Sequence, residues 1–232
     1  MAGKLYGVGV GPGDPKLMTL KAKEVIETAD VIAVPVAAAG EKSTALSIAE
    51  QAVDLSGKEL LEVVFSMERS VVKREIYRKK AAETIQAVLD EGKSVAMIVL
   101  GDITVYSTYM YVYRYLKECG YETEMIPGIP SFCAGAAKAQ VSLVEGNESL
   151  TVISSLKNKH VLKEALEHSD NVVVMKAGSG MNYLPELLEE EGMSDKTVVL
   201  GNVGLADEYV GPPDKDIKYG YFTTLIVKKG GL

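Results

Sequence analysis

The chain has 232 residues, enough for one large domain or two small ones with a substantial buried core. Its composition, 47% hydrophobic and 25% charged, is that of a globular protein and argues against disorder. The 25 Lys and Arg against 32 Asp and Glu leave a formal charge of −7, which disfavours a large nucleic-acid-binding surface.

The sequence also indicates the compartment. No apolar run reaches the ~18 residues that a membrane-spanning helix needs, and the first residues lack the pattern of a signal peptide. The two cysteines, Cys119 and Cys133, have no metal-ligand spacing and are expected to be reduced thiols. We therefore expect a cytoplasmic protein that holds no metal and binds neither membrane nor nucleic acid.

Strand-like and helix-like segments alternate through the first part of the chain. Apolar and β-branched runs predict strands at residues 4–10, 31–34, 60–65, 94–100 and 122–126. Segments with helical spacing lie between them, at residues 20–29, 43–53, 68–91 and 106–119. This alternation predicts parallel strands joined by right-handed crossovers, with helices on both faces of the sheet.

The pattern restarts after residues 144–147. Strands are predicted at 150–154, 172–175, 197–200 and 221–227, and helices at 159–167 and 181–191. The last two strands follow one another without a convincing helix, which predicts a mixed sheet. We therefore predict an α/β protein of two domains, residues 1–145 with a parallel sheet and residues 146–232 with a mixed one.

Three glycine-containing turns follow predicted strands of the first domain. They are Gly11-Pro12-Gly13-Asp14, Gly101-Asp102-Ile103 and the Pro-Gly turn at 127–131. In an open α/β sheet, ligands bind beyond the carboxyl ends of the strands, and all three turns would line that edge. One such turn alone is as well explained by a tight turn without a ligand, but three at one edge favour a binding site.

Two common ligands do not fit the first of these turns. A dinucleotide site needs G-x-G-x-x-G, but counting from Gly7 puts Pro12 at the third position, and counting from Gly9 puts Asp14 there. The acidic residue expected after the second strand is also missing. A phosphate-binding loop would need Gly-x-x-x-x-Gly-Lys-Ser or Gly-x-x-x-x-Gly-Lys-Thr. The sequence has one Gly-Lys-Ser, at residues 92–94, but Ala87 stands where the first glycine is required.

The order of the turns, G-x-G-P-G-D, then G-D before a tyrosine-bearing helix, then P-G-I-x-S, resembles the tetrapyrrole (corrin/porphyrin) methylase family. The similarity covers nearly the whole chain and includes Val174-Met175 and residues 223–227. Residues 65–69 (FSMER) and 106–111 (YSTYMY) resemble the branch that methylates cobalt-precorrin-2 at C-20. Ile103 departs from the family, which usually has a stiffening proline there.

This resemblance implies an S-adenosylmethionine (SAM)-dependent methyltransferase of cobalamin biosynthesis. It implies two α/β domains with an active-site cleft between them, a tetrapyrrole acceptor with or without cobalt, and a homodimer. The cofactor-binding residues that it implies are Pro12, Leu100, Gly101, Asp102, Val105, Pro130, Ser131, Met175, Gly201, Asn202, Thr223 and Thr224. By chemistry alone, Asp102 could equally be a turn residue that accepts backbone N–H bonds, and Met175 a core methionine.

Two further residues have candidate roles in the reaction. The Tyr106 hydroxyl could accept the proton that leaves the acceptor carbon, although helix packing also explains this tyrosine. A polycarboxylate acceptor needs local cations on this acidic protein, and Arg69 is the candidate for that contact. Arg74 and Arg78 follow on the same predicted helix, where a solvated charged face explains them as well.

Other functions on the same fold stay open. The acceptor could be another precorrin, or a protein side chain as in diphthine synthase, while ribosomal RNA is disfavoured by the negative charge. The chain could also be a ligand-binding relative without catalysis, in which the Gly-Asp-Ile loop is a degenerate cofactor site. SAM affinity and turnover distinguish these cases.

Overall fold

A computed structural model describes residues 2–66, 70–156, 158–181, 183–214 and 216–232. The chain divides into two compact units, Met1–Pro130 and Ser131–Leu232, which are described separately. The predicted boundary lay fifteen residues later, after residue 145. The difference is helix α5 (Ser131–Ala139), for which no element was predicted and which packs on the second sheet.

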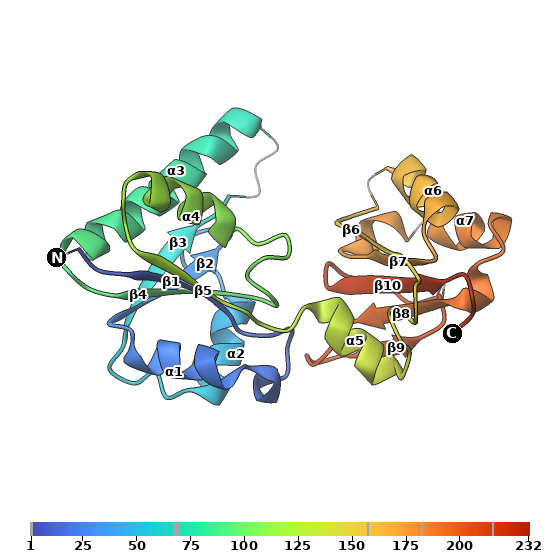
Figure 1. Cartoon of the computed structure of the whole chain (residues 1–232), viewed down its shortest axis with the longest axis horizontal. Coiled ribbons are helices and arrows are strands. Elements are labelled where there is room, and N and C mark those ends of the chain that lie inside the picture. The colour runs from blue at the N-terminus through green and yellow to red at the C-terminus, as the bar shows by residue number, and fades with distance from the viewer. Residues whose placement is uncertain (1, 67–69, 157, 182, 215) are drawn as a thin grey trace. The chain divides into compact units, whose positions relative to one another are not determined.

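The first unit is a five-stranded sheet with helices on both faces (Figure 1). Its strands are β1 (Leu5–Gly9), β2 (Val31–Val36), β3 (Glu59–Val64), β4 (Val95–Val99) and β5 (Thr123–Ile126). Its helices are the 3₁₀ turn η1 (Pro15–Leu17), α1 (Leu20–Thr28), α2 (Thr44–Ala52), α3 (Val71–Asp90) and α4 (Tyr109–Glu118). The strand order is β3-β2-β4-β1-β5 and every pairing is parallel, as predicted.

Local sequence signals explain where these helices begin. The hydroxyl of Thr19 accepts the Ala22 N–H at 3.1 Å and caps α1, and Ser43 and Ser70 cap α2 and α3 in the same way. All five residues of β4 are buried, which is why its sequence shows no polar alternation.

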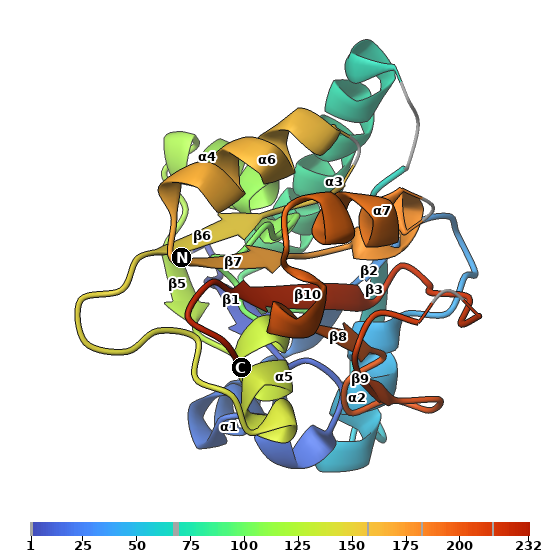
Figure 2. The ribbon, with the colours of Figure 1, turned by 90° about the vertical axis from the view of Figure 1, so that its right-hand side faces the viewer.

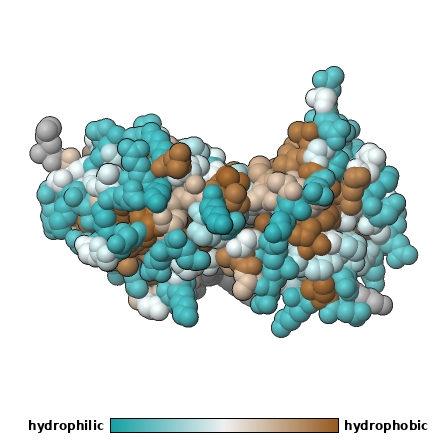
Figure 3. All heavy atoms as spheres, turned by 90° about the horizontal axis from the view of Figure 1, so that it is seen from below, coloured by the Kyte–Doolittle hydropathy of each residue, from teal (hydrophilic) through white to brown (hydrophobic). Residues whose placement is uncertain are grey.

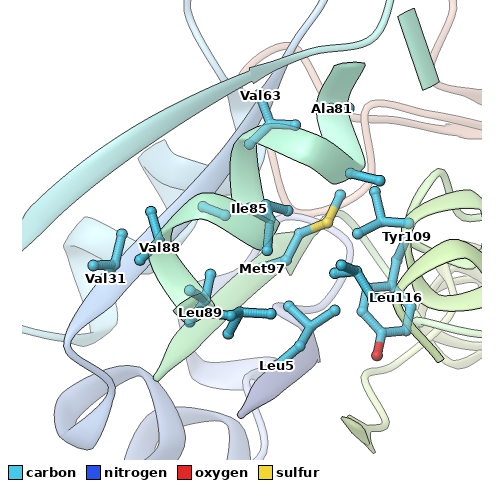
Figure 4. Close-up of a cluster of buried hydrophobic side chains, with 14 of the residues drawn as sticks. Leu5, Val31, Val63, Ala81, Ile85, Val88, Leu89, Met97, Tyr109 and Leu116 are labelled. Atoms are coloured by element: carbon cyan, nitrogen blue, oxygen red, sulfur yellow. The ribbon is translucent and has the colours of Figure 1, made fainter. Parts of the chain in front are cut away.

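Each face of the first sheet has its own core. Residues of α3 and α4 pack on one face, where Figure 4 shows Ile85 and Leu89 beside Met97 of β4 and Leu5 of β1. Residues of α1 and α2 pack on the other face against alternate residues of β1, β2 and β4. A side chain at Gly7 would meet the Tyr109 ring at 2.5 Å, so a glycine there lets α4 approach the sheet closely.

The second unit is a mixed sheet in the order β6-β7-β10-β8-β9, which Figure 2 shows most clearly. Its strands are β6 (Leu150–Ile153), β7 (Asn171–Val174), β8 (Thr197–Gly201), β9 (Tyr209–Gly211) and β10 (Thr223–Lys228). Besides α5, its helices are α6 (Lys159–His168), the 3₁₀ turn η2 (Ala177–Gly180), α7 (Leu184–Glu190) and the 3₁₀ turn η3 (Ser194–Lys196). Among the described residues of this sheet, only β6 and β7 pair in parallel, so the predicted mixed sheet is confirmed.

The two faces of this second sheet are covered differently. Helices α6 and α7 pack on one face, against residues such as Val174, Val199 and Leu225. Helix α5 contacts β9 and β10, and a side chain at Gly135 of α5 would meet Leu200 of β8 at 2.4 Å. A small-residue helix therefore covers the second face, because only a glycine allows this approach.

On the face drawn in Figure 3, hydrophilic residues cover most of the surface and hydrophobic residues are scattered among them. In the described part of the chain, no helix is long and apolar enough to cross a membrane.

Candidate functional site

The connections of the first sheet create a switch point between β1 and β4. These two strands are neighbours, yet the chain leaves β1 toward α1 on one face and leaves β4 toward α4 on the other. The adjoining loops therefore separate at the carboxyl edge of the sheet. In open α/β sheets this is the place where ligands bind.

The first two predicted turns are hydrogen-bonded to each other at this point. The Gly11 N–H donates to the Gly101 carbonyl at 3.2 Å, and the Gly101 N–H donates to the Gly11 carbonyl at 2.8 Å. Both residues have a positive φ, +83° for Gly11 and +75° for Gly101, which favours glycine at both positions. The two turns thus form one rigid backbone element.

The Asp102 carboxylate attaches the third turn to this element. One of its oxygens, Oδ2, accepts the Gly128 N–H at 3.0 Å. The other, Oδ1, accepts the Thr104 N–H at 2.8 Å and the Thr104 hydroxyl. Asp102 is 8% exposed. In these contacts it acts as a turn residue that accepts backbone N–H bonds, which is the role that its chemistry alone predicted. Because both oxygens accept hydrogen bonds, Asp102 positions the backbone of two turns.

The charge of Asp102 reflects these contacts. Burial raises the pKa of the Asp102 carboxyl, because removal from water disfavours the ionised form. The hydrogen bonds from Thr104, with those from the Gly128 and Ile103 amides, outweigh burial and hold the pKa below its usual value. The carboxylate is therefore ionised at neutral pH.

Glycines pack the three turns closely together. A side chain at Gly9 would lie 2.7 Å from both the Gly101 oxygen and the Gly128 nitrogen. A side chain at Gly128 would lie 2.1 Å from the Gly101 oxygen. Real Cβ atoms do not approach backbone so closely, so neither glycine can be replaced without a shift of the turns.

The remaining predicted residues of the first unit lie on these same turns. Pro12 is buried in the first turn, and Leu100 and Val105 flank the second and are partly buried. Pro130, also partly buried, ends the third turn. The structure thus brings Pro12, Leu100, Gly101, Asp102, Val105 and Pro130 to one edge of the first sheet.

The residue that departs from the family pattern belongs to the core. Ile103 is 1% exposed and packs with α3, α4 and the adjacent face of the sheet. Packing of its side chain anchors the loop that a proline ring would otherwise stiffen. Tyr106, three residues later, is 50% exposed and has a φ of +49°, an uncommon conformation for a non-glycine residue.

The predicted residues of the second unit also share one sheet edge. The Met175 N–H, just after β7, donates to the Ile153 carbonyl at 2.8 Å, and Thr223 lies opposite Gly201 in the β10–β8 register. The Asn202 N–H donates to the Phe222 carbonyl at 3.0 Å, and the φ of Asn202 is +49°.

The threonines of this edge are buried. Thr223 is 1% exposed and Thr224 is 5% exposed. Ser131, the first residue of α5, is partly buried and belongs to the same unit. A ligand at this edge would meet the backbone of β10 more readily than its hydroxyl groups.

Sequence reasoning placed Gly9 and Gly128 in the predicted site, but it missed Thr104 and the close packing of Gly9 against Gly128. The spacing of Asp102 and Thr104, two residues apart, is typical of a carboxylate that accepts the N–H two positions on and could have indicated Thr104. No sequence signal pairs Gly128 with Gly9, because that contact joins distant segments. Arg69, the predicted substrate contact, lies outside the described residues.

The first unit also has a hollow of about 600 Å³ that lies away from the three turns and whose charged lining residues are mainly acidic. It lies beside β2, β3 and α2, and none of the three turns lines it. Its charged residues are Glu41, Glu50 and Glu62 with only Lys42 to balance them. This hollow is unsuited to an anionic ligand.

The chain is similar to known proteins in both sequence and fold. A model of the tetrapyrrole (corrin/porphyrin) methylases matches residues 4–213. The chain belongs to this family. Among solved structures, the cobalamin biosynthetic enzyme cobalt precorrin-4 methyltransferase has a TM-score of 0.71 over 97% of this chain and 94% of its own. At 20% identity, that similarity shows the shared fold.

Curated members of the tetrapyrrole methylases match with higher identity. A protein of Methanocaldococcus jannaschii named "Probable cobalt-precorrin-2 C(20)-methyltransferase" is 38% identical over 86% of this chain and 88% of its own length. The cobalt-precorrin-2 C(20)-methyltransferase of Salmonella typhimurium is 30% identical over 99% of this chain and 98% of its own.

Proposed function

We propose that this tetrapyrrole methylase transfers the methyl group of SAM to C-20 of cobalt-precorrin-2 in cobalamin biosynthesis. The observation that carries the proposal is the 38% identity to a relative of that name, over most of both chains. The three joined turns at the switch point of the first sheet support a built ligand site.

The residues at the switch point fit an extended cofactor such as SAM. A side chain at Gly101 would have no described heavy atom nearer than the Ile129 oxygen at 3.9 Å, so the space beside this glycine is open. The turn backbone can therefore be approached closely by a ligand. We assign cofactor binding to the six residues of this edge and to Ser131, Met175, Gly201, Asn202, Thr223 and Thr224 of the second unit.

When bound, SAM supplies a methyl group on a positively charged sulfur, already activated for transfer to carbon. The work left to the protein is orientation and the exclusion of water. The Gly11–Gly101 pair and Asp102 perform the first task, because they fix three loops relative to one another.

The variant Gly101→Ala is expected to bind SAM about tenfold or more weakly, because the methyl group of the new alanine would enter the space beside the turn. The matched control is Gly120→Ala, since Gly120 has a φ of +86° and nothing within 4 Å. Both variants should lose about 1–2 kcal/mol of stability through left-handed strain, but only Gly101→Ala should lose affinity in calorimetry. Equal SAM affinity in the two variants would contradict the placement.

We assign the hydroxyl of Tyr106 to relay to solvent the proton that the acceptor carbon loses after its new carbon–carbon bond has formed. The Tyr106 oxygen takes that proton as its own O–H proton passes to water, which reaches this half-exposed side chain. The variant Tyr106→Phe keeps the ring and the backbone conformation and removes only the oxygen. We expect kcat to fall about 100-fold while the Kd for SAM stays within twofold. An unchanged kcat would leave Tyr106 with a packing role.

Parallel incubations test whether the acceptor carries cobalt. Precorrin-2 with and without cobalt is supplied with SAM, and initial rates are compared. The proposal predicts a higher kcat/KM for the cobalt form. A preference for the metal-free form would contradict it, and turnover of another precorrin alone would favour the alternative acceptor.

We also propose that the protein works in the cytoplasm as a homodimer, as its family resemblance implies. Light scattering should give about twice the chain mass of 24.9 kDa. A mass equal to one chain at micromolar concentration would contradict the dimer.

A further inference from the structure

Helix α3 is much longer than the strands on which it packs. Its 20 residues span about 30 Å, whereas the five residues of β4 span about 17 Å. Within α3, every buried residue lies at or after Ala81. The N-terminal half, residues 71–80, therefore projects past the sheet, as Figures 1 and 2 both show. Because α3 follows the carboxyl end of β3, it projects at the edge that carries the three turns.

Two arginines form one face of this projecting half. Arg74 and Arg78 are one helical turn apart and are partly buried, whereas the other residues of 71–80 are exposed. The Arg78 guanidinium lies 3.5 Å from the centre of the Tyr111 ring of α4 and pairs with Glu75. Such stacking holds the planar guanidinium in one orientation.

Arg74 has unused hydrogen-bonding capacity. Its Nε is buried and has no hydrogen-bond partner among the described residues. A buried donor on a cation is costly unless an acceptor reaches it. Exposed apolar side chains flank Arg74, with Val71 on one side and Tyr77 on the other, each about 60° from it around the helix axis.

We propose that the projecting half of α3 binds the tetrapyrrole acceptor, with Arg74 and Arg78 holding its peripheral carboxylates. The proposal rests on the proposed function, because a polycarboxylate macrocycle is the ligand whose chemistry fits. Arginine forks match carboxylates, and Val71 and Tyr77 provide apolar surface for the ring edge. The cationic face is local, since the whole chain carries a formal charge of −7. Tyr111 acts as a positioning residue for Arg78.

Steady-state kinetics test the surface in the full-length protein. Arg74→Gln and Arg78→Gln should each raise the KM for cobalt-precorrin-2 about 10- to 100-fold and leave the Kd for SAM within twofold. Tyr111→Ala should resemble Arg78→Gln, and Tyr111→Phe should resemble the wild type. The matched control is Arg114→Gln, because Arg114 is an exposed arginine of α4. An unchanged KM in both α3 variants would overturn the proposal.

A binding measurement separates this inference from the proposed reaction. Uroporphyrin III, a macrocycle with eight carboxylates, is titrated into each variant and followed by its absorbance. Wild type and Arg114→Gln should bind it, and the Arg74→Gln/Arg78→Gln double variant should bind at least tenfold more weakly. Equal binding by all variants, or no binding by the wild type, contradicts the surface. Arginine-dependent binding without methylation of cobalt-precorrin-2 would contradict only the proposed reaction.

Discussion

Asp102→Ala should raise the Kd for SAM about 10- to 100-fold and lower the free energy of unfolding by about 2–3 kcal/mol. The substitution removes the acceptor for the Gly128 and Thr104 N–H groups, which then lie partly buried without that partner. The second and third turns lose their connection, so the cofactor meets loops that are no longer fixed. Calorimetric titration with SAM and chemical denaturation measure the two effects.

Asp102→Asn is the control that keeps the shape. Its amide oxygen can replace only one of the two carboxylate oxygens, so both effects should be intermediate.

Because the pKa of Asp102 is held below the usual value of ~3.9, the ionised carboxylate stabilises the fold above that pH. The stability difference between wild type and Asp102→Ala should therefore shrink as the pH falls below about 4. A difference that grows in acid would contradict this role.

Gly128→Ala should destabilise the first unit by about 3 kcal/mol and abolish measurable SAM binding. The added Cβ would lie 2.1 Å from the Gly101 oxygen and 2.9 Å from the Gly9 Cα, and both are backbone atoms. No side-chain rotation relieves this contact, so the turns must move apart. A Tm lower by roughly 6–10 °C is the expected thermal result.

The matched control for Gly128→Ala is Gly220→Ala. Neither glycine has a φ in the left-handed region, but a side chain at Gly220 would have nothing within 4 Å. This control should change stability by less than about 0.5 kcal/mol and leave SAM affinity unchanged. If both variants behaved alike, close packing of the three turns would not explain the site.

Much of the fold could be predicted because its signals are local. A buried run such as 95–99 indicates a strand, and capping residues such as Thr19 and Ser43 indicate where a helix begins. Both signals lie within a few positions of the element that they predict. Helix α5 was missed because its small residues form no local helical pattern. Gly135, for example, is small because its helix packs closely against the distant Leu200. Short β9 was missed for a similar reason, since its three residues are a strand only by pairing with β8.

The candidate site shows the same division. Strand ends and turn glycines predicted that the loops after β1, β4 and β5 share one edge. The sequence alone could not predict that Gly11 and Gly101 bond to each other, or that Asp102 bonds Gly128, because these contacts join segments 26 or more residues apart. The arginine face of α3 depends on tertiary packing, since stacking of Arg78 on Tyr111 distinguishes it from a solvated helix face.

The position of the new methyl group tests the central claim most directly. The protein is incubated with cobalt-precorrin-2 and SAM carrying ¹³C in its methyl group, and the product is examined by mass spectrometry and carbon NMR. The account predicts one added methyl group, located at C-20. A methyl group at any other carbon, or no transfer by a protein that binds SAM, would contradict it.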